Sequence, residues 1–187
     1  MISADPDLSG DLRISTEVFE LTPLCHDDAG DLLAEFGDPG VVEWMDIEPL
    51  ETLEQATSII DWAAGQRALG AGVRWAIRRR CDGAFVGTCG FNRIILERGR
   101  RGEIAYDLTR AWQGLGVMSQ VLPAVIAFGW ERLRLHRQEA LVTPGNARSC
   151  ALLERHGFLR EGELAGYGFW KGRFWDQIVY GKVADPA

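Results

Sequence analysis

The chain has 187 residues, and its 20 Lys and Arg against 27 Asp and Glu give a formal net charge of −7. A length below about 250–300 residues favours one domain with one core. With 47% hydrophobic and 25% charged residues, the composition excludes a disordered chain. The acidic balance argues against a protein that coats nucleic acid, because that requires a basic surface, and it suits a cationic substrate.

The cysteines form no CxxC pair and have no histidine at ligand spacing, which excludes a disulfide framework and a zinc site and indicates a reducing compartment. They are Cys25, Cys81, Cys89 and Cys150. Residues 1–10 are acidic and polar, unlike a signal peptide. The longest apolar run, 121–130, is too short to span a bilayer. We therefore expect a cytoplasmic protein without a metal and without a membrane or nucleic-acid partner. The oligomeric state stays open, a homodimer included.

Secondary-structure signals begin after a polar leader over residues 1–15. We expect a strand over 18–22, a helix over 26–36, and a second helix after the capping signal Thr52-Leu53-Glu54-Gln55. Alternating side chains predict strands over 73–80 and 84–91, joined by a turn at Cys81-Asp82-Gly83. The first half of the chain thus contributes both helices and antiparallel strands.

Helix and strand alternate in the second half. The expected elements are a strand over 103–108, a helix over 116–133, a strand over 138–142, a helix from Asn146 to Gly157, and a strand over 175–183. This order predicts a mixed α/β domain, residues 16–187, in which helices flank one sheet.

The segment most informative about chemistry is a glycine-containing turn between the strand over 103–108 and the following helix. It reads Gln113, Gly114, Leu115, Gly116, Val117, Met118 and Ser119. Glycines leave backbone N–H groups uncovered at a helix N-terminus, where the helix dipole also favours an anion. A phosphate could therefore bind here, although the same turn could equally be a plain strand-to-helix connection. A Walker loop is excluded because no Gly-Lys-Ser/Thr follows.

Two motifs together resemble the GNAT acyltransferase superfamily. Gln113-x-x-Gly116-x-Met118 resembles its Arg/Gln-x-x-Gly-x-Gly/Ala loop, with Met118 in place of the last small residue. Asn146-x-x-Ser149-x-x-Leu152-Leu153-Glu154-x-x-Gly157-Phe158 resembles its second signature helix. With the opening Phe19-x-Leu21-Thr22-Pro23-Leu24, the pattern is most similar to the RimJ/RimL-like branch, which contains ribosomal-protein N-terminal acetyltransferases.

The resemblance implies where acetyl-CoA would bind. The pyrophosphate would lie on the amides of residues 114–119, and the pantetheine arm would pair with Leu108, Thr109 and Arg110. That arm would be accommodated where two parallel strands, 103–110 and 138–142, splay apart. Asn146 matches the asparagine that contacts the arm. The alternative is that it serves only as the N-cap of its helix. Met118 would set the helix start slightly farther from the cofactor.

The resemblance also implies candidates for proton transfer. Many superfamily members protonate the leaving thiolate with a tyrosine, and Leu153 stands at that position. Ser149 is the substitute, unless it only caps its own helix. Glu103 matches the glutamate base of some members, and Tyr106 is the second candidate. The alternative for Glu103 is a solvated acid at the strand end without a catalytic role. Alternation places Glu103 and Asp107 on one strand face and Tyr106 on the other.

These features predict an acetyl-CoA-dependent N-acetyltransferase acting on a primary amine by direct attack in a ternary complex. A protein N-terminus is the favoured acceptor and a small polyamine or aminoglycoside-like amine the alternative. Trp44, Met45 and Trp62 fall where the superfamily builds its acceptor lid. The alternative from a different functional class is a CoA-binding sensor or interaction module without turnover. It would explain why Leu153 replaces the tyrosine, why Met118 replaces the small residue, and why no acid adjoins Tyr167 in the sequence.

Overall fold

The protein is built around one eight-stranded sheet, ordered β1-β2-β3-β4-β5-β6-β8-β7. The computed structural model describes residue 8 and residues 10–184. The strands are β1 (Ile14–Ser15), β2 (Phe19–Pro23), β3 (Val73–Arg79), β4 (Phe85–Ile95), β5 (Arg101–Leu108), β6 (Arg137–Val142), β7 (Leu159–Trp170) and β8 (Arg173–Val183). The α-helices are α1 (Ala29–Phe36), α2 (Leu53–Ala68), α3 (Val117–Glu131) and α4 (Ala147–Arg155), with short 3-10 turns η1 (His26–Asp28), η2 (Val42–Trp44) and η3 (Arg110–Trp112). This mixed sheet flanked by helices confirms the expected fold class.

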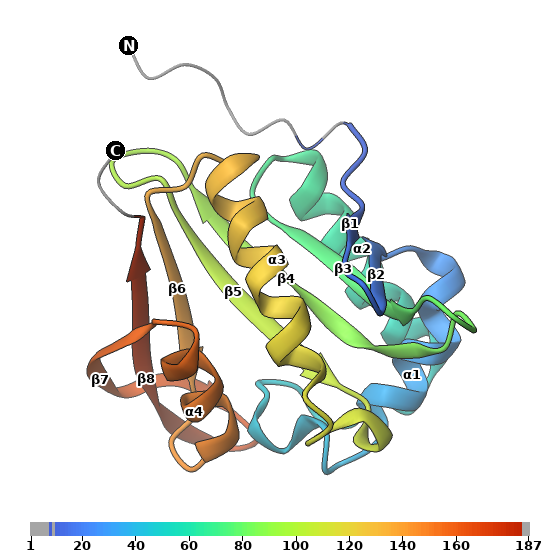
Figure 1. Cartoon of the computed structure of the whole chain (residues 1–187). Coiled ribbons are helices and arrows are strands. Elements are labelled where there is room, and N and C mark those ends of the chain that lie inside the picture. The colour runs from blue at the N-terminus through green and yellow to red at the C-terminus, as the bar shows by residue number, and fades with distance from the viewer. Residues whose placement is uncertain (1–7, 9, 185–187) are drawn as a thin grey trace.

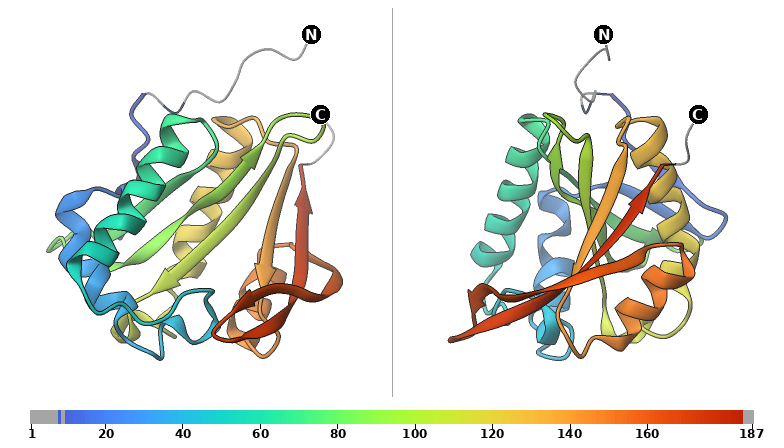
Figure 2. Two further views of the ribbon diagram at one scale, coloured as in Figure 1. Left: turned by 180° about the vertical axis from the view of Figure 1, so that it is seen from behind. Right: turned by 90° about the vertical axis from the view of Figure 1, so that its left-hand side faces the viewer.

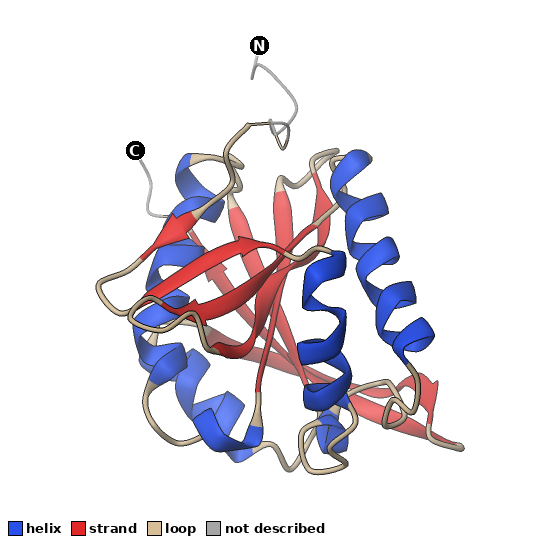
Figure 3. Ribbon diagram, turned by 90° about the vertical axis from the view of Figure 1, so that its right-hand side faces the viewer, coloured by secondary structure: helices blue, strands red, loops and turns tan. Residues whose placement is uncertain are grey.

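Helices cover the sheet on both faces (Figures 1 and 3). The larger core lies between the sheet and α3 and includes Trp75 and Phe128, whose rings meet edge to face with centroids 5.1 Å apart. The smaller core joins α1 and α2 to the opposite face. Because both faces are covered, β3 is buried along its whole first part, Val73–Ile77, despite its alternating sequence.

The parallel strands β5 and β6 pair over a short stretch only. Arg101, Gly102 and Glu103 pair with Arg137, Gln138 and Glu139. Beyond Glu103, β5 stays paired with β4 as far as Leu108, and β6 stays paired with β8 as far as Val142. The two strands therefore part into a V, as expected, and Figure 2 shows them diverging.

The structure differs from expectation at several elements. In the expected leader, residues 1–7 and 9 lie outside the described part, but Leu8, Leu12 and Ile14 are buried in the main core, and Leu12 O accepts a hydrogen bond from Trp75 Nε1 (2.8 Å). The helix expected over 26–36 begins as the 3-10 turn η1. Strand β7 has no counterpart among the expected elements. None of the helices described is long and apolar enough to cross a membrane.

A buried ionic cluster ties β3, β4 and β5 together beneath α1. Arg74 forms a salt bridge with Asp107, and Thr88 donates to Asp107 Oδ1 through its backbone N–H (3.0 Å) and its hydroxyl (2.8 Å). Glu35 on α1 is only 2% exposed, and its carboxyl oxygens have no hydrogen-bond partner among the described residues. Burial and the negative charge of Asp107 raise the pKa of Glu35 well above its usual value.

This pKa gives a first prediction, for Glu35→Gln. A raised folded-state pKa contributes stability below the unfolded pKa, about 4.3, and that contribution is lost as pH rises through the folded value. The neutral amide of Gln does not ionise. We expect the variant to gain unfolding free energy relative to the wild type between pH 5 and pH 8, by more than the about 0.5 kcal/mol typical of surface substitutions. Urea unfolding at both pH values measures this.

The matched control is Glu54→Gln, which changes an exposed glutamate on α2. A difference between wild type and Glu35→Gln that is the same at both pH values would show that Glu35 is ionised throughout.

Candidate active site

The turn before α3 presents backbone amides to solvent. Gly114 and Gly116 have φ values of +75° and +76°, in the left-handed region that glycine adopts without strain. Gly116 is the N-cap of α3 and supplies no side-chain cap, so the first amides of the helix are free to bind a ligand. Free N–H groups and the positive end of a 15-residue helix make this turn an electrostatically favourable place for an anion.

The side chains of the turn mostly point away from that end of α3. Val117 and Met118 are buried in the main core, whereas Leu115 is 64% exposed. Met118 was expected to hold the helix start away from a cofactor, but its bulk is taken up by the core. Gln113 donates through Nε2 to Leu108 O (3.0 Å) and so ties the turn to the end of β5.

The backbone at the end of β5 is partly engaged already. The amide of Thr109 donates to Val86 O on β4 (3.0 Å), and Leu108 O accepts from Gln113. The amide of Thr109 therefore faces β4 and is not free to pair with a pantetheine arm. The expected pairing of a pantetheine arm with the backbone of residues 108–110 would use other groups of this segment, and it stays a prediction.

Asn146, Ser149 and Tyr106 come together where α4 packs on β5. Asn146 Oδ1 caps α4 by accepting from the amide of Ser149 (3.2 Å). The hydroxyls of Ser149 and Tyr106 are hydrogen-bonded at 2.7 Å, so the serine side chain is directed at β5. Burial raises the pKa of Tyr106, which keeps the phenol protonated and able to donate. The pair is a chain of two O–H groups at the inner side of α4.

Glu103 lies on the opposite face of β5, at the apex of the V. Ile104, Tyr106 and Leu108 contact the α3 core, while Asp107 joins the cluster under α1, so the expected alternation is confirmed. Burial and the neighbouring Glu139 raise the pKa of Glu103, as does Asp46 more weakly. A carboxylate with a raised pKa is a stronger proton acceptor. Glu139 is ion-paired with Arg137 (2.7 Å), and Arg93 opposes the pKa shift of Glu103, so the charge around the apex is mixed.

The loop between α1 and α2, residues 37–52, spans the open end of the V on the same face of the sheet as Glu103. At one wall, Arg110 Nη1 lies 3.5 Å from Asp38 Oδ1. At the other, Thr143 Oγ1 donates to Trp44 O (3.1 Å), and Lys171 Nζ at the tip of the β7–β8 hairpin donates to Val42 O (2.6 Å). The indole of Trp44 packs on Gly145, where a Cβ would come within 2.7 Å of it. Trp62, by contrast, is 45% exposed on α2.

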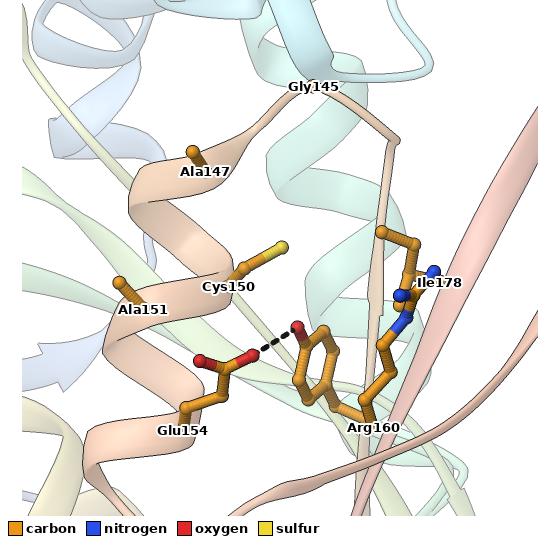
Figure 4. A pocket seen from close by; sticks show the side chains of 8 residues that line it. Gly145, Ala147, Cys150, Ala151, Glu154, Arg160 and Ile178 are labelled. Carbon is orange, nitrogen blue, oxygen red and sulfur yellow. Dashed lines mark hydrogen bonds between the residues drawn. The ribbon is translucent and has the colours of Figure 1, made fainter.

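A separate pocket of about 370 Å³ lies between α4 and the end of the sheet (Figure 4). Tyr180 donates a hydrogen bond to Glu154 Oε1 (2.9 Å) at its edge, and the thiol of Cys150 lines it. Its lining contains none of the residues expected to bind the cofactor. Within residues 8 and 10–184, no three His, Cys, Asp or Glu side chains are grouped to hold a metal ion.

Comparison with known proteins identifies the family. The sequence profile described as "Acetyltransferase (GNAT) domain" matches residues 19–159. The chain belongs to the GNAT acetyltransferase family. Its enzyme class is that of the family, an acetyltransferase with acetyl-CoA as donor, and the resemblance found in the two sequence motifs is confirmed.

Three proteins illustrate what this GNAT chain is similar to. An uncharacterized N-acetyltransferase, p20 of Bacillus licheniformis, is 36% identical over 88% of this chain and 92% of its own length. The ribosomal protein uS5-alanine N-acetyltransferase of Escherichia coli is 30% identical over 51% of this chain and 49% of its own. Mycobacterium smegmatis RimJ, solved in complex with CoA-disulfide, superposes with a TM-score of 0.82 at 25% identity, covering 94% and 87% of the two chains.

The candidate site thus combines residues that lie in the two sequence motifs with residues that lie outside them. The turn 113–119, Asn146, Ser149 and Tyr106 lie on the α3–α4 side, and Glu103 lies across the sheet. Sequence reasoning missed Thr143 and Gln177, whose buried hydrogen bond (2.9 Å) supports the loop at Trp44. It also missed Arg155, which reaches Ser119 from α4. These contacts join distant segments, so no local pattern marks them.

A second prediction concerns Asn146 as an N-cap. Asn146→Ala removes the acceptor for the Ser149 amide and should lower the unfolding free energy by about 0.5–2 kcal/mol. For a chain of this size, that corresponds to a fall in Tm of roughly 2–4 °C per kcal/mol. Asn146→Asp keeps an oxygen that can accept this bond and should stay near wild type. Equal melting of all three proteins would show that Asn146 does not cap α4 in solution.

Proposed function

We propose that this protein transfers the acetyl group of acetyl-CoA to a primary amine, with a protein N-terminus as the favoured acceptor. The observation that carries the proposal is the placement of a proton donor and a proton acceptor on opposite faces of β5, next to the point where β5 and β6 part. The catalytic unit we propose extends beyond the expected residues 16–187, because Leu8, Leu12 and Ile14 belong to its main core, and it would act in the cytoplasm.

The donor substrate would enter from the α3–α4 side. Amides of the turn 114–119 would hold the pyrophosphate, and the pantetheine arm would run into the V toward Ser149. Among residues 108–110, the amides of Leu108 and Arg110 would be the groups that pair with the arm. Asn146 would contact the arm while capping α4. This chain's own groups thus bind and orient the thioester without a metal.

Acetyl transfer then needs a neutral amine, a stabilised oxyanion and a proton for the leaving thiolate. Glu103 would take a proton from the ammonium group on the acceptor side. The free amine attacks the thioester carbonyl, and the carbon–sulfur bond breaks as the tetrahedral intermediate collapses. Ser149 would protonate the departing sulfur while Tyr106 passes a proton to Ser149 through their hydrogen bond. The proton that the attacking nitrogen loses as the amide forms would go to solvent, and a proton from solvent would restore the Tyr106 phenol.

The cysteines support direct transfer rather than an acyl-enzyme. Burial raises the pKa of Cys89 to about 12, which leaves almost no thiolate at neutral pH. Cys25 and Cys81 are exposed outside the V, and Cys150 lines the separate pocket on α4. No cysteine among the described residues is therefore placed to act as nucleophile between the two substrates.

The acceptor class follows from charge and from relatives. The carboxylate of Glu103 at the apex would attract the ammonium group of any amine. An α-amino group, with a pKa of about 7.7–8.0, is deprotonated far more easily than a lysine at about 10.4. The similar E. coli protein is named ribosomal protein uS5-alanine N-acetyltransferase, and this likeness supports a protein acceptor over a small polyamine.

Incubation with acetyl-CoA and a library of peptides and small amines tests the function. We expect a mass increase of one acetyl group on the N-terminus of some peptides, with release of free CoA thiol. Acetylation confined to polyamines would show that the acceptor is a small amine and not a protein N-terminus. Unchanged masses together with tight CoA binding would favour a CoA-binding module without turnover.

The third prediction concerns the hydroxyl pair. Ser149→Ala should lower kcat by about 10–100-fold, within the range for a positioned proton donor when water can substitute. Affinity for acetyl-CoA should change little, because the thiolate forms only during collapse of the intermediate. Tyr106→Phe should lower kcat as well, and the double variant should lose less than the product of the two effects. Multiplicative effects would show that the two hydroxyls act independently, and an unchanged kcat with lower stability would show that the pair is structural.

The fourth prediction concerns Glu103 as the base. Glu103→Gln should lower turnover most near pH 7 and recover partly toward pH 9, where an α-amino acceptor is already neutral. In the wild type, kcat/KM should fall at low pH as Glu103 becomes protonated, and its raised pKa moves this fall to higher pH. Rate profiles of both proteins from pH 5.5 to pH 9 give the answer. A loss that is parallel at every pH would assign Glu103 to binding or folding instead.

A further inference from the structure

An arginine of α4 reaches across to the first turn of α3. Arg155 Nη1 donates a hydrogen bond to Ser119 Oγ at 3.3 Å. The side chain is exposed, and it forms no ion pair with a carboxylate in residues 8 and 10–184. Its charge is thus held beside the free amides that follow Gly116 without being neutralised by the protein.

The position of Arg155 on α4 turns it toward α3. Arg148, Leu152 and Arg155 follow one another at helical spacing and share one face. Leu152 packs against the core that α3 shares, so this face of α4 is turned toward α3. Figure 1 shows both helices on the same side of the sheet. Arg148 is exposed on the same face, two turns earlier.

Coenzyme A carries a further anionic group to which the proposed use of the turn assigns no partner. Besides the pyrophosphate, it has a phosphate on the 3′ carbon of the ribose, a few bonds away. A guanidinium presents a planar fork of donors that matches phosphate oxygens, and charge-assisted hydrogen bonds of this kind are among the stronger ones. Arg155 is a mobile cation within side-chain reach of Ser119, the residue at the edge of the proposed pyrophosphate site.

We propose that Arg155 binds the 3′-phosphate of coenzyme A and thereby makes the enzyme prefer CoA to dephospho-CoA, which lacks that group. The inference rests on the proposed use of the turn 114–119 as the pyrophosphate site. The alternative role of Arg155 is a cation in the last turn of α4 that interacts with the helix dipole. That role predicts a change in stability and no change in ligand preference.

Calorimetric titration of the full-length protein with CoA and with dephospho-CoA tests the proposal. The wild type should bind CoA about tenfold or more tightly than dephospho-CoA, as expected for a charged hydrogen bond. Arg155→Ala should bind the two ligands about equally, because only CoA affinity falls. Arg155→Lys should recover part of the preference through its charge. Arg148→Ala, the matched control, should keep the wild-type ratio.

A wild type without preference, or an Arg155→Ala variant that loses affinity for both ligands alike, would overturn the proposal. Gly116→Asp separates this failure from failure of the proposed site, because a carboxylate beside the pyrophosphate should abolish binding of both ligands. If the folded Gly116→Asp protein binds CoA as the wild type does, the turn is not the pyrophosphate site. The ratio measured for Arg155→Ala still decides whether Arg155 reads the 3′-phosphate.

Discussion

The parallel pairing of β5 with β6 stops at Glu103 and Glu139, and the rest of the site is arranged around that stop. Each strand continues, but its hydrogen-bonding partner beyond this point lies on its outer side, in β4 for one and β8 for the other. Backbone N–H and C=O groups facing the gap lack a strand partner, and buried groups of this kind are normally satisfied. An extended molecule with amide groups, such as the pantetheine arm, can supply the missing partner.

Parting of the strands also separates the two substrates. Side chains alternate along β5, so neighbouring residues serve opposite faces. Tyr106 meets Ser149 under α4, whereas Glu103 faces the loop held at Asp38 and Trp44. A thioester in the gap can thus be approached by the amine from one face while its sulfur receives a proton from the other. Under the proposed mechanism, Ser149, one turn before Leu153 and hydrogen-bonded to the buried phenol of Tyr106, would provide the proton donor that the leucine cannot.

Local patterns allowed much of the fold and part of the site to be predicted. Thr52 and Gln55 form the capping box that their spacing indicates, and Asn146 caps α4. The turn before α3 is recognisable because glycine is needed at positive φ. Strand β7 was missed because its sequence is rich in glycine and nearly all of it is exposed, so that only pairing with β8 makes it a strand.

Interactions between distant segments could not be predicted in the same way. Glu35 and Asp107 are far apart in sequence and have ordinary flanking residues, yet they share one buried site with Arg74. Tyr167 has no acidic neighbour in sequence, but pairing of β7 with β8 brings Asp176 close to it. The carboxylate of Asp176 accepts a hydrogen bond from the amide of Gly166 (2.7 Å). Contacts of this kind depend on the sheet order, which brings together strands that are far apart in the sequence.

Amide hydrogen exchange with and without CoA tests most directly whether the gap between β5 and β6 receives the cofactor arm. CoA should slow exchange in residues 104–110 and in the turn 114–119, because new partners satisfy amides that are free without it. Residues 101–103, already paired with β6, should change little. Slower exchange in the turn alone would place the phosphates there but leave the gap empty. Bound CoA with unchanged exchange along both segments would contradict the account.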